Sequence, residues 1–215
     1  RKIFEEAKRQ GKITIAGGIF PTANQDYLQA DYTVVGEGEQ TLLELVQALE
    51  KGEDPNVLGL STTKRRPAIK NIDAIKPAYD LLPMELYRDH VKGLVYSSRG
   101  CVNACDFCTV SPHWNRMQRH RSIESVVEEL EMYKDLGFNI VNFKDESLTT
   151  DKERLFALAK EVKGMGLRFK AKARLKDLDE ETLSVMHEAG FREIHTGVES
   201  VTHSFEKGVS REEVV

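Results

Sequence analysis

The segment Arg99-Gly-Cys-Val-Asn-Ala-Cys-Asp-Phe-Cys108 holds every cysteine of the 215-residue chain. The three cysteines have the spacing C-x3-C-x2-C, and the sequence has no fourth cysteine to complete the set. Three thiolates on one loop can bind three irons of a cubane cluster and leave the fourth iron without a protein ligand. The spacing therefore predicts a [4Fe–4S] cluster with one open iron, with Cys101, Cys105 and Cys108 as its ligands.

Structural zinc is the alternative use of these thiols. A structural zinc ion takes four protein ligands, and His113 could supply the fourth. On that hypothesis the chain is a non-catalytic metal-binding module. A metal analysis separates the two, since zinc without sulfide indicates the module.

Composition limits the class of protein. The formal net charge is −4 and the sequence pI is near 5.9, which does not favour a broad nucleic-acid surface. No apolar run approaches the ~20 residues of a membrane helix, and no secretory signal is visible. An odd set of close cysteines argues against a secreted disulfide framework, so we expect a cytoplasmic location.

The segment from residue 94 onward alternates strands and helices. Strands are predicted at 94–97, 139–143, 167–174 and 193–196, and helices at 122–136, 151–163 and 179–188. Ser122 is the predicted N-cap of the first of these helices. This order predicts an α/β fold with a parallel sheet and outer helices, either open or rolled into a barrel.

The first 60 residues predict a different unit. A helix over 3–9, a strand over 13–16, a turn at Pro21, a strand over 31–35 and a helix around 42–49 fit the last units of a doubly wound sheet. We expect a domain over 1–60, a linker over 61–92 and a second domain over 93–215. Because both domains are shorter than their fold types require, we expect the chain to be a piece of a longer protein.

Polar groups follow each strand of the second segment. The second strand is followed by Lys144-Asp-Glu-Ser147, the third by Arg174 and the fourth by Gly197-Val-Glu-Ser200. The carboxyl ends of parallel strands meet at one edge of a sheet, where sites form. We therefore expect these groups and the cysteines to share one rim.

With Phe107 before its last cysteine, the loop resembles the cluster loop of radical S-adenosylmethionine (radical SAM) enzymes. In that family the loop follows the first strand of a partial (β/α)6 barrel, and the resemblance implies such a barrel here with about four strands present. It also implies that the open iron binds the amino and carboxylate groups of S-adenosylmethionine. One electron from the reduced cluster then cleaves the sulfonium C–S bond, and the resulting 5′-deoxyadenosyl radical abstracts a hydrogen atom from the substrate.

The resemblance also implies roles for residues at the other strand ends. Asp145 or Glu146 would bind the methionine ammonium, and Arg174 would meet the methionine carboxylate. Glu199 and Ser200 would contact the ribose or the carboxylate.

A second resemblance lies in the first unit. Gly17-Gly18, Pro21-Thr22, the segment Asp31-Tyr-Thr-Val-Val35 and Gly36-Glu-Gly-Glu39 are similar to the carboxyl-terminal end of a Rossmann-like cobalamin-binding domain. Such a domain precedes the radical domain in one large subfamily. The resemblance implies that Gly17 and Gly18 allow close approach of the nucleotide tail of cobalamin in the intact protein.

Together the resemblances imply an enzyme that methylates or otherwise modifies an unactivated carbon of a small molecule. It would take electrons from a donor such as flavodoxin or ferredoxin. A methylthiotransferase acting on tRNA is the other enzyme class that remains open at this point.

Overall fold

The computed structural model describes residues 1–87, 92–105 and 107–198. The chain divides into two compact units, Arg1–Lys70 and Asn71–Val215. The predicted linker 61–92 is thus shared between the two units. In the described part of the chain, no helix combines the length and the apolar character needed to cross a membrane.

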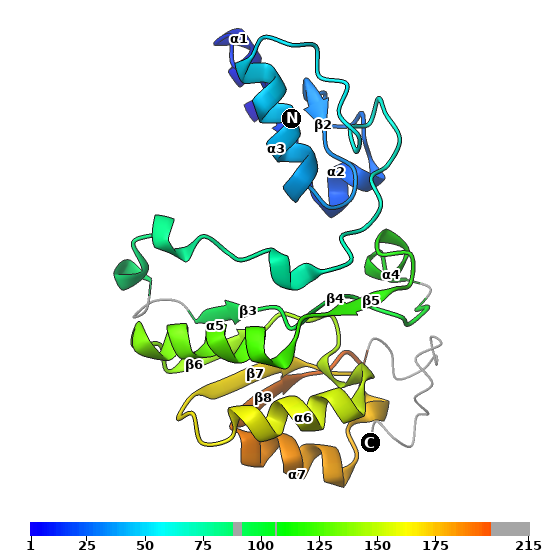
Figure 1. Ribbon diagram of the computed structural model, residues 1–215. Helices are drawn as coiled ribbons and strands as arrows, with labels where there is room; N and C mark the ends of the chain where they lie inside the picture. Colours follow the sequence, from blue (N-terminus) through cyan, green and yellow to red (C-terminus); the bar gives the residue numbers. More distant parts are fainter. Residues whose placement is uncertain (88–91, 106, 199–215) are drawn as a thin grey trace. The chain divides into compact units, whose positions relative to one another are not determined.

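Four parallel strands form the sheet of the second unit, in the order β3-β6-β7-β8 (Figure 1). As the sequence predicted, one helix precedes each of the strands β6, β7 and β8 along the chain. The strands are β3 (Gly93–Val95), β6 (Ile140–Phe143), β7 (Arg168–Lys172) and β8 (Phe191–His195). The connecting helices are α5 (Ile123–Asp135), α6 (Lys152–Val162) and α7 (Glu180–Ala189).

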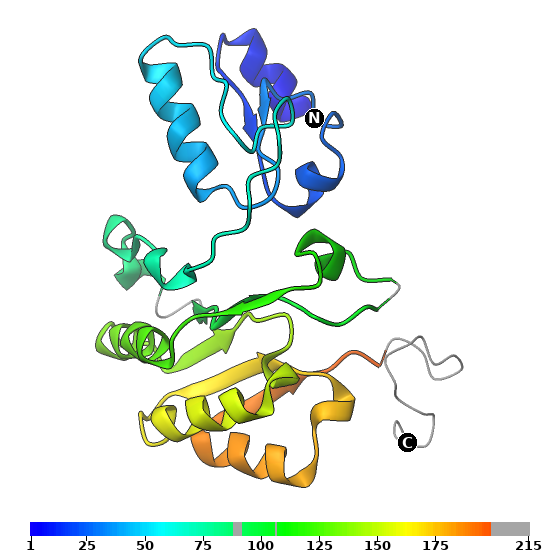
Figure 2. The ribbon, with the colours of Figure 1, turned by 45° about the vertical axis from the view of Figure 1, so that its right-hand side comes forward.

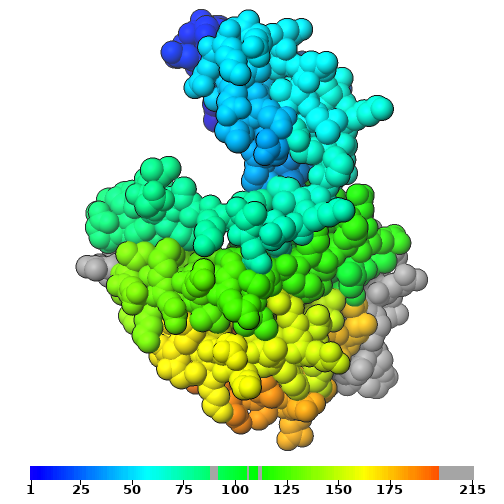
Figure 3. Space-filling view, viewed as in Figure 1, coloured from blue at the N-terminus to red at the C-terminus, as the bar shows by residue number. Residues whose placement is uncertain are grey.

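All three helices lie on the same face of this sheet, as Figures 1 and 2 show. In Figure 3 the outer surfaces of these helices are neighbours on the visible face of the unit. Doubly wound sheets carry helices on both faces, whereas the strands of a (β/α) barrel carry them on the outer face alone. The second unit therefore has the layer arrangement of a barrel segment, as expected.

The core lies between the sheet and these helices. Phe143, Phe169 and Phe191 pack against one another with ring centroids 5.2 to 5.6 Å apart. Leu130 and Leu158 on the helices are 0 and 1% exposed and belong to the same core. Burial of these side chains is the main favourable term that holds the helices to the sheet.

The opposite face of the sheet carries mainly polar side chains. Leu94, Asn142, Lys170 and Glu193 are partners in one cross-strand row, and Lys170 forms an ion pair with Glu193. Side chains alternate between the two faces of a strand, so apolar and polar residues alternate along β7, and buried and partly exposed residues alternate along β6. The polar face leads along the strands towards the rim where the site is found.

The helices begin at the predicted kind of cap. The Ser122 hydroxyl accepts a hydrogen bond from the Ser125 amide, 3.2 Å away, which confirms the predicted N-cap of α5. Asp151 and Asp179 accept corresponding bonds at the starts of α6 and α7. Each cap satisfies an amide that has no partner inside its helix.

The segment from residue 71 to 86 is tied to α5 by partly buried polar groups. It contains three single-turn helices, Ile72–Ala74, Tyr79–Leu81 and Met84–Leu86. Asp73 accepts a hydrogen bond from the Ser122 amide at 3.0 Å. The Tyr79 hydroxyl donates to Glu129 at 2.7 Å, and burial raises the pKa of that phenol. Arg121 donates to the other oxygen of the Glu129 carboxylate.

The first unit is a small α/β layer. A parallel pair of short strands is flanked by helices, over a core of Val34, Leu45, Val57 and Leu60. The elements are α1 (Lys2–Arg9), β1 (Ile15–Ala16), α2 (Ile19–Ala23), β2 (Tyr32–Thr33) and α3 (Glu39–Glu50).

The turn predicted at Pro21 is wrong, because a short helix lies there. Pro21 is the third residue of α2. The first-turn amides of a helix have no intrahelical acceptor, so a proline at this position removes no backbone hydrogen bond. Pro21 is buried and belongs to the packed side of the helix.

We predict that Glu129→Gln lowers the free energy of unfolding by about 2–3 kcal/mol, because it removes the nearer of the two carboxylates that pair with the buried Arg121 guanidinium. The Glu129 and Arg121 side chains are 7 and 10% exposed. Glu128→Gln is the matched control, since its ion pair with Lys76 is 67 and 74% exposed and such pairs contribute ~0–1 kcal/mol. Urea unfolding measures both variants, and equal losses would contradict the assignment.

Candidate functional site

The cysteines lie on a loop inside a short antiparallel hairpin. Its strands are β4 (Ser98–Gly100) and β5 (Gln118–His120), and the loop between them contains the helix α4 (Val110–His113). The predicted strand over 94–97 was too long: β3 ends at Val95, and the chain bends before β4. The cysteine loop therefore follows β4, beyond the carboxyl end of β3.

Gly100 allows the two hairpin strands to approach each other beside Cys101. Its φ is +93°, and a Cβ at this position would lie 2.1 Å from the Met117 carbonyl oxygen. No other residue fits a backbone contact that close. The position of Cys101 therefore depends on a glycine immediately before it.

The bend before β4 is held by the carboxylate of Asp145, which lies at the end of β6. Asp145 accepts a hydrogen bond from the Ser97 amide at 3.0 Å and from the Ser97 hydroxyl at 2.7 Å. It also accepts one from the Ser98 hydroxyl. All three residues are at most 3% exposed. Arg154 donates to the Ser97 carbonyl at 3.3 Å, and burial lowers the pKa of that guanidinium.

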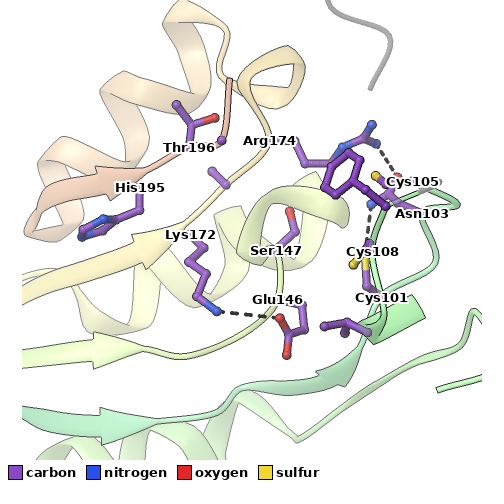
Figure 4. A pocket seen from close by; sticks show the side chains of 14 residues that line it. Cys101, Asn103, Cys105, Cys108, Glu146, Ser147, Lys172, Arg174, His195 and Thr196 are labelled. Atoms are coloured by element: carbon purple, nitrogen blue, oxygen red, sulfur yellow. Dashed lines mark hydrogen bonds and ion pairs between the residues drawn. The ribbon is translucent and has the colours of Figure 1, made fainter. Parts of the chain in front are cut away.

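The three cysteines border one pocket with residues from three strand ends (Figure 4). The pocket has a volume of about 340 Å³, which suits a small molecule. Its charged and polar lining groups outside the cysteine loop are Glu146, Ser147, Lys172, Arg174, His195 and Thr196. Part of the predicted rim is therefore found here: Glu146, Ser147, Arg174 and Gly197 share the pocket with the cysteines, whereas Asp145 does not line it.

Three contacts connect polar and charged groups that line this pocket. The Lys172 ammonium lies 3.7 Å from a carboxylate oxygen of Glu146, and both side chains are partly exposed. Arg174 donates a hydrogen bond to the side-chain oxygen of Asn103, and the amide nitrogen of Asn103 donates to Cys101 Sγ at 3.3 Å. The ends of β6 and β7 thus each meet a partner from another element.

The structure gives different surroundings to Asp145 and Glu146, which the sequence had left as alternatives for one role. Glu146 lines the pocket with Arg174 and the cysteines, while the Asp145 carboxylate is occupied by Ser97 and Ser98. Glu199 and Ser200 lie outside the described residues.

Gly17 and Gly18 follow β1 in the first unit, where Gly18 has φ +102° and open space beside its Cα. The positive φ requires a glycine-like residue whether or not a ligand is bound.

Sequence reasoning missed Asn103 and Lys172 as lining residues. For Lys172 a signal was present, because apolar Phe169 and Ala171 alternate with lysines along β7. The lysines therefore had to face away from the helices. The role of Asn103 depends on a contact across 71 residues of sequence, which no local pattern carries.

The thiols fit an iron–sulfur cluster. All three cysteines are half-buried and free of disulfides, and they share a pocket rather than a core. In the described ranges, no three His, Cys, Asp or Glu side chains are arranged around a single metal ion. His113, the fourth ligand of the zinc hypothesis, packs edge-on against Trp114 with ring centroids 4.8 Å apart.

Comparison with protein families gives a match to the Radical SAM superfamily over residues 95–214. This range begins in β3 and includes the cysteine hairpin and the pocket-lining strand ends.

Two curated relatives are similar to most of the chain. An uncharacterised methyltransferase, PH0819, of Pyrococcus horikoshii is 36% identical over 187 residues, which are 80% of this chain and 41% of the relative. An anaerobic magnesium-protoporphyrin IX monomethyl ester cyclase of Synechocystis is 26% identical and matches 97% of this chain and 46% of its own length. The chain therefore spans less than half the length of these relatives.

A solved structure shares the fold. The radical S-adenosylmethionine methyltransferase TsrM of Kitasatospora setae, with cobalamin and a [4Fe–4S] cluster bound, superposes with a TM-score of 0.79 at 20% sequence identity. The match covers 99% of this chain and 49% of TsrM.

We predict that Asp145→Ala lowers the free energy of unfolding by about 2–4 kcal/mol, because it leaves buried donors of Ser97 and Ser98 without an acceptor. Glu146→Ala, one residue along the chain, is the control and is expected to cost less than about 1 kcal/mol. Chemical denaturation measures both. If Glu146→Ala is the more damaging variant, the anchoring role of Asp145 is wrong.

Proposed function

Because the chain belongs to the radical SAM superfamily, we propose that it is the catalytic part of an enzyme that modifies an unactivated carbon of a small molecule. Methylation is the reaction that we propose first, since a 36% identical relative is named a methyltransferase. The observation that carries the proposal is the single pocket lined by three cysteines together with Glu146, Lys172 and Arg174.

Cys101, Cys105 and Cys108 would hold a [4Fe–4S] cluster through three of its irons. With S-adenosylmethionine bound, the reduced cluster supplies reductive cleavage of a sulfonium C–S bond and hence hydrogen-atom abstraction from an unreactive carbon. The residues of this chain bind, orient and enclose the reactants.

Glu146 would accept the ammonium of S-adenosylmethionine in a charge-assisted hydrogen bond, and Arg174 would bind the carboxylate. The two side chains reach the pocket from the ends of β6 and β7, which are hydrogen-bonded neighbours. They can therefore hold the two charged groups of one amino acid. We also propose that Glu199 and Ser200 contact the ribose or carboxylate.

We further propose cobalamin binding by the intact protein, with Gly17 and Gly18 near its nucleotide tail. The open space at Gly18 supports this proposal, as does the likeness to a cobalamin-containing structure. An electron donor of the flavodoxin or ferredoxin class and a cytoplasmic location complete the proposal, because the cluster needs one electron and its thiols need a reducing compartment.

The test is anaerobic reconstitution of the full-length protein with iron and sulfide. We expect about four irons per chain and, with dithionite and S-adenosylmethionine, formation of 5′-deoxyadenosine. Cys105→Ala is expected to lose both the cluster spectrum and this product. Zinc binding without sulfide, or a cluster that cleaves no S-adenosylmethionine, would contradict the proposed function.

A second prediction concerns Lys172. Its ammonium is paired with the carboxylate of Glu146, which is the group proposed to bind the ammonium of S-adenosylmethionine. Binding must displace Lys172 from Glu146. Lys172→Met is therefore expected to lower the Kd for S-adenosylmethionine about two- to fivefold, as removal of a partly exposed ion pair allows.

Equilibrium binding to the cluster-loaded protein measures this change. Lys144→Met removes the same charge at the end of the neighbouring strand, without a contact to Glu146, and controls for the general attraction of a cationic ligand. If Lys172→Met weakens binding, Lys172 is a ligand of S-adenosylmethionine and not its competitor.

A further inference from the structure

Asn103 connects the cluster loop to the end of β7. It lies two residues after Cys101, and its side chain lies between Arg174 and the Cys101 sulfur, as Figure 4 shows. The amide nitrogen is 3.3 Å from Cys101 Sγ, within the range of a hydrogen bond to sulfur. Neither the cysteine spacing nor the roles proposed above use this side chain.

Arg174 determines which way the Asn103 amide points. A primary amide has an accepting oxygen and a donating NH2 group, while a guanidinium only donates. The oxygen must therefore face Arg174, and the NH2 group is left to face Cys101. Asparagine orientation is assigned from such networks, and here one donor-only partner is enough to fix it.

We propose that the Asn103 amide, held by Arg174, donates a hydrogen bond to the Cys101 thiolate and thereby raises the midpoint potential of the cluster. The inference rests on the proposed function, because it requires the cluster. Asn103 acts as a positioning residue: it touches a ligand sulfur and not the reacting carbon.

The physical reason is the charge that the cluster gains on reduction. One electron passes from a flavodoxin- or ferredoxin-type donor to the cluster, whose core charge falls from 2+ to 1+, and the donor is oxidised by one electron. No proton moves and no covalent bond changes. The ligand sulfur becomes more negative, so the N–H···S bond is stronger in the reduced state. Hydrogen bonds to cluster sulfurs tune potentials in this way.

Partial burial makes this bond effective. Cys101 and Asn103 are both half-buried, so water competes less for the sulfur than it would on an open surface. The Arg174 guanidinium also polarises the amide that it holds, which makes the NH2 group a better donor.

The test is a redox titration of the cluster-loaded protein without S-adenosylmethionine, followed by electron paramagnetic resonance. Asn103→Leu keeps the branched shape of the side chain, with two methyl groups in place of the amide oxygen and nitrogen, and removes the donor. We expect about tenfold less reduced cluster at a fixed potential, a shift of about 59 mV to more negative values for a one-electron couple. Val102→Ala, an exposed change on the same loop, is the control and should leave the potential unchanged.

A double-mutant cycle tests the part played by Arg174. Arg174→Met removes a positive charge and also releases the amide, whereas in the Asn103→Leu background only the charge effect remains. The shift caused by Arg174→Met should therefore be smaller in that background. Asn103→Ala replaces Asn103→Leu if the latter does not retain about four irons.

Two outcomes separate this inference from the proposed function. A wild-type protein that holds no [4Fe–4S] cluster contradicts the proposed function itself. A cluster whose potential is the same in wild type and in the Asn103 variants overturns the role of Asn103 and leaves the proposed function intact.

Discussion

The carboxylate of Asp145 joins the two parts of the structure that have to meet for a site to form. It lies at the end of β6 in the parallel sheet, and it accepts hydrogen bonds from Ser97 and Ser98 at the bend that leads into the cysteine hairpin. A buried carboxylate is costly unless donors surround it, so its presence fixes the bend in one conformation. The next residue, Glu146, then points into the pocket. One strand end thus sets both the loop that carries the thiols and the carboxylate that faces them.

Much of the second unit could be predicted because its signals are local. Helical periodicity, a serine N-cap and glycine stops gave α5, α6 and α7 to within one or two residues, and alternation of strands with helices gave the parallel sheet. The hairpin of β4 and β5 was missed because its strands, Ser98–Gly100 and Gln118–His120, are three residues long and lack apolar alternation. Their pairing is decided by Gly100 and by side chains from β6 and α6. A period of two cannot be recognised in three residues.

The candidate site, too, could be predicted only in part. The cysteine spacing is a property of the sequence, and the rule that strand ends share an edge brought Glu146 and Arg174 to it. What the sequence could not decide was which of two adjacent acidic residues faces the pocket, because successive residues beyond a strand end no longer alternate reliably. The hydrogen bonds to Asp145 decide it. Lys172 was overlooked for another reason: a lysine on a strand is usually interpreted as exposed to solvent, yet here the face opposite the helices leads into the site.

The cationic side chains that line the pocket are already paired within the protein. Two cationic side chains, Lys172 and Arg174, each have a partner inside the protein, Glu146 and Asn103. On the proposed function, the ammonium of a bound amino acid replaces Lys172 at Glu146, and its carboxylate replaces the Asn103 amide oxygen at Arg174. Binding is then an exchange of contacts rather than a burial of unpaired charge, and this limits the desolvation penalty. The exchange at Arg174 also touches the amide that faces Cys101, so the group that binds the carboxylate and the group that faces the cluster ligand are directly connected. If the proposed roles of Arg174 and Asn103 hold, occupancy of the pocket changes the electron affinity of the cluster through one hydrogen bond.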